Sequence, residues 1–156
     1  MKNVTIFDLD ETVIDSRHRT PNNPDGSLNL AKYHELQCRE NIYKDTLLPI
    51  ARIMSARFIA GDFIVILTAR GMSPADYDYL RDRGLPYHLI LSRNDIADDH
   101  YKLSDGAYKL RHIVAFLDSC EAKNVVMFDD AKLVKTELRK LFPVLCAHKV
   151  NKRLRK

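Results

Sequence analysis

The chain has 156 residues, of which 46% are hydrophobic and 29% charged, and its formal net charge is +4. A chain of this length and ordinary composition buries about 70% of its unfolded surface, which is enough for one core and one domain. No apolar run approaches the roughly 20 residues that span a bilayer, and the three scattered cysteines do not fit a disulfide scaffold or a zinc ribbon. We therefore expect a cytoplasmic protein with reduced thiols and no membrane partner.

Short apolar runs along the chain alternate with segments whose apolar residues recur at helical spacing. The run at 63–67 is continuous, as in a strand that is buried on both faces. Five strands are expected, at residues 4–7, 63–67, 88–91, 124–128 and 144–147. Four helices are expected between them, near residues 47–58, 74–83, 110–117 and 134–141. This alternation predicts a parallel, Rossmann-like sheet in a three-layer α/β/α sandwich.

Residues 16–46 and 149–156 depart from this alternation. The first segment carries prolines, a glycine and asparagines with little periodicity, so we expect an irregular flap there. The second holds five basic residues and no acidic one, whereas the rest of the chain carries 20 basic and 21 acidic residues. We interpret 149–156 as a basic tail outside a single domain at 1–148. It is either an arm for an anionic partner or a solvated, disordered terminus.

Polar side chains directly follow three of the expected strands. Asp8 and Asp10 come after the first strand, Thr68 after the second, and Asp129 and Asp130 after the fourth. Because ligands bind at the carboxyl edge of an open parallel sheet, we expect these side chains to share one site. Converging carboxylates repel one another unless a divalent cation neutralises them, and oxygen ligands favour Mg²⁺. Each residue alone could instead cap a strand or helix, but the joint pattern indicates a site.

Four segments of the chain resemble the motifs of the haloacid-dehalogenase-like phosphohydrolases. They are residues 7–12, Thr68 with the leucine before it, Lys109, and residues 128–130. The resemblance runs from residue 4 to about residue 147 and implies a Rossmann-like core with only a small flap or cap. It also implies a Mg²⁺-dependent phosphatase that works through an aspartyl-phosphate.

The resemblance assigns a role to each matched residue. Asp8 would be the nucleophile and Asp10 the general acid/base, while Thr68 and Lys109 would hold the transferring phosphoryl group. An acid at position 10 favours phosphate over haloacid chemistry, because only phosphate ester cleavage needs a proton on the leaving oxygen. The implied metal ligands are Asp8, Asp10, Asp129 and Asp130.

Two lysines compete for the phosphate-binding role because the tripeptide Tyr-Lys-Leu occurs twice. Lys109 opens the expected helix before the fourth strand, where the family's lysine belongs, and is the first choice. Lys102 lies in the preceding loop and is the second. Either lysine could instead be a solvated surface residue.

A narrower resemblance concerns the substrate. Thr68-Ala69-Arg70, together with Arg93 before an acidic loop, resembles the phosphatase domain of phage-type polynucleotide kinase–phosphatases. This likeness implies hydrolysis of 3′-phosphates at polynucleotide ends. The chain differs in having Glu11 where glycine is usual, and it lacks the glycine-rich phosphate loop of a kinase. The implied substrate-binding residues are Thr12, Arg17, Arg19, Arg70 and Arg93.

Other substrates stay open at this point. Little of the chain is spare for a cap domain, which favours an open site and a phosphate on a large substrate. The alternatives are a mononucleotide or another small phosphometabolite, with the flap as a lid, and a phosphoprotein. A non-catalytic nucleic-acid-binding module is a more remote alternative, because every catalytic group of the motifs is present.

Overall fold

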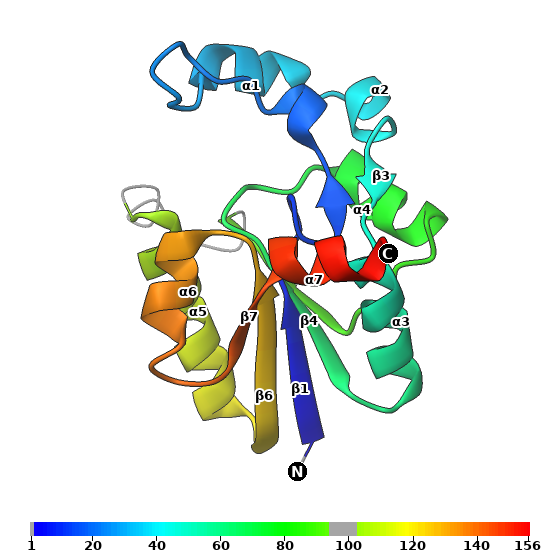
Figure 1. Cartoon of the computed structure of the whole chain (residues 1–156), viewed down its shortest axis with the longest axis vertical. Helices are drawn as coiled ribbons and strands as arrows, with labels where there is room; N and C mark the ends of the chain where they lie inside the picture. Colours follow the sequence, from blue (N-terminus) through cyan, green and yellow to red (C-terminus); the bar gives the residue numbers. More distant parts are fainter. Residues whose placement is uncertain (1, 94–102) are drawn as a thin grey trace.

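The protein is built around a five-stranded parallel sheet, shown in Figure 1. The computed structural model describes residues 2–93 and 103–156. The strand order is β5-β4-β1-β6-β7, and every neighbouring pair is parallel. The strands are β1 (Lys2–Phe7), β4 (Phe63–Leu67), β5 (Leu89–Leu91), β6 (Ala122–Asp129) and β7 (Val144–Cys146). All five expected strands are present, with β1 at the centre.

Helices cover both faces of this sheet, which confirms the predicted three-layer sandwich. Ile64 and Ile66 of β4 pack into the apolar cluster on one face. Val65 and Leu67 pack into a second cluster on the opposite face, because successive side chains of a strand alternate. The first face is covered by α3 (Ile50–Ile59), α4 (Pro74–Asp82) and α7 (Ala147–Leu154), and the second by α5 (Asp105–Ser119) and α6 (Lys132–Leu138).

The start of α4 follows from local chemistry that the sequence already contains. The Ser73 side chain accepts a hydrogen bond from the backbone N–H of Asp76, and the Asp76 carboxylate accepts one from the backbone N–H of Ser73, at 2.8 Å. Pro74 occupies the first helical position, where its missing N–H costs nothing. The helix therefore begins where predicted, and the capping box fixes Asp76 at the carboxyl edge of the sheet.

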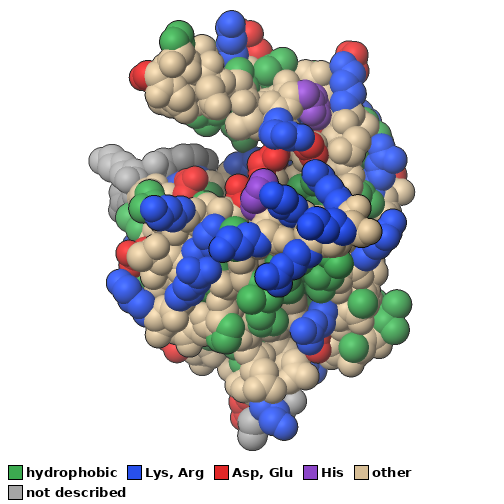
Figure 2. Space-filling model, in the orientation of Figure 1, with side chains coloured by type: hydrophobic (Ala, Val, Ile, Leu, Met, Phe, Trp, Pro, Cys, Tyr) green, Lys and Arg blue, Asp and Glu red, His purple; other side chains and the backbone are tan. Residues whose placement is uncertain are grey.

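The flap at residues 16–46 contains more regular structure than expected. It holds the 3₁₀ helix η1 (Arg17–Arg19) and two short helices, α1 (Leu30–Leu36) and α2 (Arg39–Ile42). An antiparallel pair, β2 (Ile14–Asp15) with β3 (Thr46–Leu47), forms its base. Apolar periodicity does not predict α1 because none of its residues is buried. In Figure 1 the flap arches over the carboxyl edge of the sheet, and Figure 2 shows a hollow beneath it.

The basic end of the chain is a folded helix and not a disordered tail. Residues 147–154 form α7, whose Ala147 and Asn151 are buried against the core. The Asn151 side chain accepts a hydrogen bond from the Ile50 N–H at 2.8 Å and donates one to the Thr12 carbonyl at 3.0 Å. The boundary expected at residue 148 therefore falls inside an element of the domain. Among the described residues, no helix is long and apolar enough to cross a membrane.

Candidate active site

Asp8 lies at the centre of the carboxyl edge, directly after β1. Its backbone N–H donates to the Phe128 carbonyl of β6 at 2.9 Å, which continues the parallel ladder by one residue. One carboxylate oxygen accepts from Lys109 Nζ at 2.7 Å and the other from Thr12 Oγ1 at 3.1 Å. Only 5% of Asp8 is exposed. The carboxylate is thus held in one orientation at the edge of the core.

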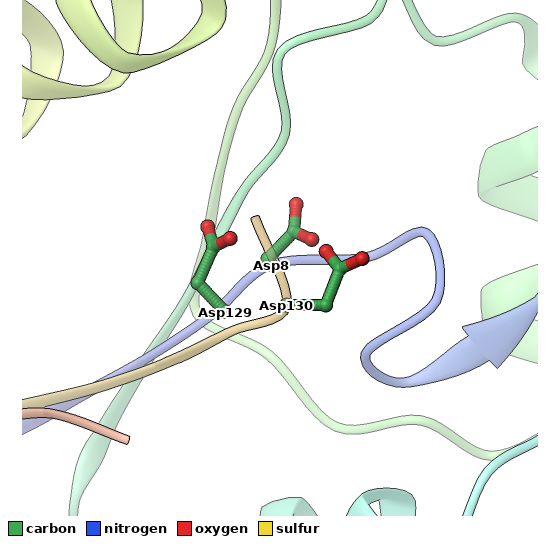
Figure 3. A group of neighbouring side chains, drawn as sticks. All are labelled: Asp8, Asp129 and Asp130. Atoms are coloured by element: carbon green, nitrogen blue, oxygen red, sulfur yellow. The ribbon is translucent and has the colours of Figure 1, made fainter. Parts of the chain in front are cut away.

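Two further carboxylates lie beside Asp8, as Figure 3 shows. Asp8, Asp129 and Asp130 each offer an oxygen, and these atoms lie within 4.8 Å of one another. The register that pairs Phe7 with Phe128 brings the ends of β1 and β6 together and so places the three side chains. Asp129 is fixed further, because one of its oxygens accepts from the Ala131 N–H at 2.8 Å. The cluster is an all-oxygen donor set of the kind that Mg²⁺ prefers.

The protonation of this cluster reflects burial and mutual repulsion. Burial raises the pKa of Asp8 to about 7, with Lys109 opposing the rise and Asp129 adding to it. Burial and the nearby Asp8 raise the pKa of Asp130 to about 6, and burial also raises that of Asp129. One lysine does not neutralise three buried carboxylates, so the cluster fits a divalent cation.

Lys109 and Thr68 both lie at this edge. Lys109, in the first turn of α5, is buried and donates from Nζ to Asp8 and Asp129, at 2.7 Å each. Burial opposes its charge, but the two carboxylates raise the pKa of Lys109 above its usual range. Thr68 follows β4, the strand paired with β1, and is buried. Lys102, the second choice for the phosphate-binding lysine, lies outside the described residues.

The Asp10 carboxylate points to a different set of partners. It accepts hydrogen bonds from Ser16 Oγ at 2.8 Å and from Arg70 Nε at 2.7 Å. Burial alone would raise the pKa of Asp10, but Arg70 and then Arg19 hold it below its ordinary value. Asp10 is therefore outside the three-carboxylate cluster, although it was expected among the metal ligands, and it is ionised in this arrangement.

Arg70 is the one arginine of the expected set that bonds Asp10 directly. Its Nη1 lies 3.1 Å from an Asp76 oxygen, and its Nη2 is buried without a hydrogen-bond partner among the described residues. A buried guanidinium N–H without a partner costs free energy, which a ligand oxygen would recover. Arg70 Nη2 thus offers a free hydrogen-bond donor beside the loop at residues 8–13, which follows β1 and carries Asp8 and Asp10.

The other three arginines are engaged elsewhere. Arg19 is 1% exposed and pairs with the buried Asp45 at 2.6 Å. The Arg17 side chain is 73% exposed and bonds to Asp15 on the surface. Arg93 donates to the Ala69 and Leu103 carbonyls and pairs with Asp105. Arg19 also lies near Arg70, since its Nη2 is 3.9 Å from Asp10 and 3.8 Å from Asp76, the two carboxylates that Arg70 contacts. Arg17 and Arg93 are not brought to that position.

Glu11 occupies a backbone position that favours glycine. Its φ is 57°, in the left-handed region, where a side chain costs about 1 kcal/mol. This explains why glycine is usual there in the resembled phosphatases. In this chain the Glu11 carboxylate accepts a hydrogen bond from the Ser16 N–H at 3.0 Å, which offsets part of the strain. The turn carries the chain away from β1 after Asp8 and toward Arg70.

Three residues that support the site were missed from the sequence. Ser16 bonds Asp10, Asp76 bonds Arg70, and Asn151 bonds the Thr12 backbone. Asp76 could have been found as the third residue of a capping box. Asn151 has no local signal, because its hydrogen-bond partners lie 101 and 139 residues away in sequence.

The fold is similar to that of haloacid-dehalogenase-like hydrolases. A protein of that family from Streptococcus pneumoniae is 12% identical, has a TM-score of 0.60, and matches 93% of this chain and 84% of its own. A chain of the Pnkp1/Rnl/Hen1 RNA repair complex is 21% identical, with a TM-score of 0.63 over 94% of this chain and 42% of its own. These likenesses concern the fold alone.

Sequence comparison places the chain more narrowly. A model of the bacteriophage T5 5′-deoxynucleotidase family matches residues 1–155, and the chain belongs to that family. The 5′-deoxynucleotidase of Escherichia phage T5 is 34% identical over 146 residues. The match covers 83% of this chain, which spans about 60% of the length of that relative.

Proposed function

We propose that this protein is a Mg²⁺-dependent phosphatase that acts on deoxynucleoside 5′-monophosphates through an aspartyl-phosphate on Asp8. The observation that carries the proposal is the placement of Asp8. It is buried at a sheet edge, bonded to Lys109 and Thr12, and adjacent to two further carboxylates. A carboxylate on the exposed surface of a protein would have none of these features.

Asp8, Asp129 and Asp130 would hold the Mg²⁺, because their oxygens already converge and carry more negative charge than Lys109 neutralises. Bound Mg²⁺ supplies neutralisation of charge between the attacking carboxylate and the anionic phosphate. Lys109 and Thr68 would hold the transferring phosphoryl oxygens. In the structure described, Lys109 Nζ bridges Asp8 and Asp129 at 2.7 Å, so its position already suits that role.

The reaction divides into two displacements at phosphorus. An Asp8 oxygen forms a bond to phosphorus while the bond to the nucleoside O5′ breaks, and Asp10 gives a proton to O5′. A water molecule then attacks the phosphorus, Asp10 takes a proton from that water, and inorganic phosphate leaves Asp8. Asp10 is ionised while it is bonded to Arg70, so it must first take up a proton from solvent as that bond loosens, and in later turnovers the proton that it takes from water serves this step. A substrate oxygen that accepts from Arg70 would compete with Asp10 and produce that release.

Membership of the 5′-deoxynucleotidase family favours a mononucleotide over the 3′-phosphorylated polynucleotide end that the arginine pattern implied. The surroundings of the arginines agree with this preference. Arg19 forms a buried ion pair with Asp45, and Arg17 pairs with Asp15 at the surface. Arg70, by contrast, keeps a buried donor, Nη2, without a hydrogen-bond partner among the described residues.

The flap supplies a candidate contact for the nucleoside. Tyr33 in α1 is half-buried, and desolvation raises the pKa of its hydroxyl, on which the nearby charges of Arg70 and Asp10 also act. Of two other tyrosines that contact the flap or belong to it, Tyr43 donates to Asp82 and Tyr79 to the Asp45 carbonyl. Tyr33 is therefore the residue that we place against the nucleoside.

The first test replaces the nucleophile. Asp8→Asn keeps the size of the side chain but removes its negative charge, so phosphate release should fall by roughly a thousandfold or more. The matched control is Asp118→Asn on the exposed surface of α5, which should retain wild-type turnover. Full activity in Asp8→Asn would overturn the assignment of the nucleophile.

The substrate is tested by phosphate release from a panel, with Mg²⁺ and with EDTA. The panel contains deoxynucleoside 5′-monophosphates, a 3′-phosphorylated oligonucleotide and a phosphopeptide. We expect kcat/KM to be at least about tenfold higher for the mononucleotides, and EDTA to abolish turnover. Faster release from the oligonucleotide would restore the 3′-end assignment. No release from any substrate would favour the non-catalytic module.

A further inference from the structure

The exposed side of α7 carries a stripe of cations. Lys149, Lys152 and Arg153 lie along one side of the helix, and Lys156, two residues beyond its end, continues their i, i+3, i+4, i+7 spacing in the sequence. All four are exposed. We call these four residues the α7 stripe. In Figure 2 Lys and Arg side chains gather over α6 and α7 on this face of the molecule.

The charge of the α7 stripe is not neutralised within the protein. Residues 147–156 contain no acidic residue. In the described part of the chain, none of the four stripe cations forms an ion pair within 4.0 Å, although cations elsewhere, such as Arg39 and Arg81, pair with nearby aspartates. Four unpaired cations within eight residues repel one another, which an anionic partner would relieve.

The stripe is presented on a rigid support. Ala147 and Asn151, on the opposite side of α7, are buried, and Val150 packs against the core. Asn151 is hydrogen-bonded to Ile50 and Thr12. Binding a partner to this surface therefore does not require ordering a flexible arm, and the entropic cost of binding is correspondingly smaller.

We propose that the α7 stripe binds the phosphate backbone of a nucleic acid without reading its sequence. A backbone is a regular row of negative charges, and lysine and arginine contacts alone account for this kind of binding. A membrane surface fits less well, because the apolar side of α7 is already buried and Leu154 is the one large apolar residue that it exposes. A protein partner would require apolar or aromatic side chains at the centre of the surface, and the stripe has none.

The α7 stripe lies next to the loop at residues 8–13 but differs from the loop in the sign of its charge. A groove between α7 and that loop is lined by Lys152, Arg155 and Lys156 on one side and by Glu11 and Asp15 on the other. The two acids repel a phosphate backbone, so a bound strand stays on the α7 side of this groove. Nucleic-acid binding and mononucleotide hydrolysis should therefore be separable by mutation.

The test uses the full chain and a DNA duplex of about 30 base pairs, with Kd measured by fluorescence anisotropy at several salt concentrations. The stripe variant is Lys149→Glu/Lys152→Glu/Lys156→Glu. The control variant is Lys32→Glu/Arg111→Glu/Lys123→Glu, which changes the net charge equally at three exposed cations outside α7 that form no ion pair with described residues. Both variants keep Asn151, which deletion of the C-terminal residues would remove.

We expect the stripe variant to weaken DNA binding by more than tenfold and to reduce the slope of log Kd against log salt by about 2.7, or 0.9 for each lost contact. The control variant should bind within about threefold of wild type, and both variants should retain wild-type hydrolysis and thermal unfolding. Equal losses in the two variants would reduce the effect to net charge and overturn the proposal. Tighter wild-type binding to anionic phospholipid vesicles than to DNA would overturn it as well.

Discussion

Asp8 and Asp10 lie two residues apart in one motif but in opposite electrostatic surroundings. Burial beside Asp129 and Asp130 raises the pKa of Asp8, whereas Arg70 and Arg19 outweigh burial and lower that of Asp10. Asp8 still continues the parallel ladder of β1 through its N–H bond to Phe128, whereas Asp10 lies beyond the ladder and turns to Ser16 and Arg70. The motif itself predicts two carboxylates. Their different charge states depend on residues that come from other strands and from the flap.

Asn151 is the residue of α7 that hydrogen-bonds the loop at residues 8–13, through the Thr12 carbonyl. Replacing it with alanine leaves the Ile50 N–H and the Thr12 carbonyl without partners in a buried place. We expect Asn151→Ala to lower the free energy of unfolding by about 2–3 kcal/mol, measured by urea denaturation. Turnover should also fall, because Thr12 orients Asp8.

The matched control for Asn151→Ala is Arg153→Ala, two residues further along the same helix and exposed. That change should alter stability by less than about 0.5 kcal/mol and leave turnover unchanged. Equal stability of the two variants would contradict the structural role of Asn151.

At the scale of elements, a buried ion pair joins the two ends of the flap to each other. Arg19 of η1 bonds Asp45, which precedes β3, and donates to Gln37 after α1. Arg17, two residues earlier, is exposed and pairs with Asp15. The two arginines were expected to share a substrate-binding role, and for the buried Arg19 we now predict a structural one.

Arg19→Met leaves the Asp45 carboxylate buried without its partner and should cost about 3–5 kcal/mol of unfolding free energy. The double variant Arg19→Met/Asp45→Leu should recover much of that loss, because no buried charge remains unpaired. Arg17→Met is the control and should cost less than about 1 kcal/mol. Urea denaturation of the variants measures both effects. A raised KM in Arg19→Met without loss of stability would return Arg19 to a direct substrate role.

The elements differ in how well they could be predicted. β4 and the start of α4 are correct because a continuous apolar run and a Ser-Pro cap are local signals. α1 was missed because it buries no residue and so has no apolar stripe. The sequence predicts a tail in place of α7, because the cations of this segment outnumber the two buried residues, Ala147 and Asn151, that anchor the helix.

At the scale of the whole molecule, the carboxylate cluster links stability to pH and to metal. The pKa values of about 7 for Asp8 and about 6 for Asp130 lie above their ordinary value of 3.8. The folded state therefore binds these protons more tightly than the unfolded state. In EDTA, stability from these groups is complete below about pH 4 and is lost as the pH rises through 6 and 7.

Urea denaturation in EDTA between pH 5 and 7.5 should accordingly give falling stability. Saturating Mg²⁺ should reverse the fall, because the metal binds the ionised cluster in the folded state. The variant Asp8→Asn/Asp130→Asn removes both titrating groups and should show a flat profile without response to Mg²⁺. A wild-type profile in EDTA that rises over this range would refute the electrostatic description of the cluster.

The net charge of +4 comes from the basic end of the chain, most of which is α7, a folded helix with exposed cations. By itself, the sequence determined the order of the five sheet strands and of the helices between them, the three-layer class and the residues that directly follow the strands, because apolar periodicity and strand-end motifs are local. Only the tertiary structure decided that Asp10 pairs with Arg70, that Arg19 forms a buried ion pair with Asp45, and that Asn151 hydrogen-bonds the Thr12 carbonyl. These contacts join residues 26 to 139 positions apart, and no local pattern records such partners.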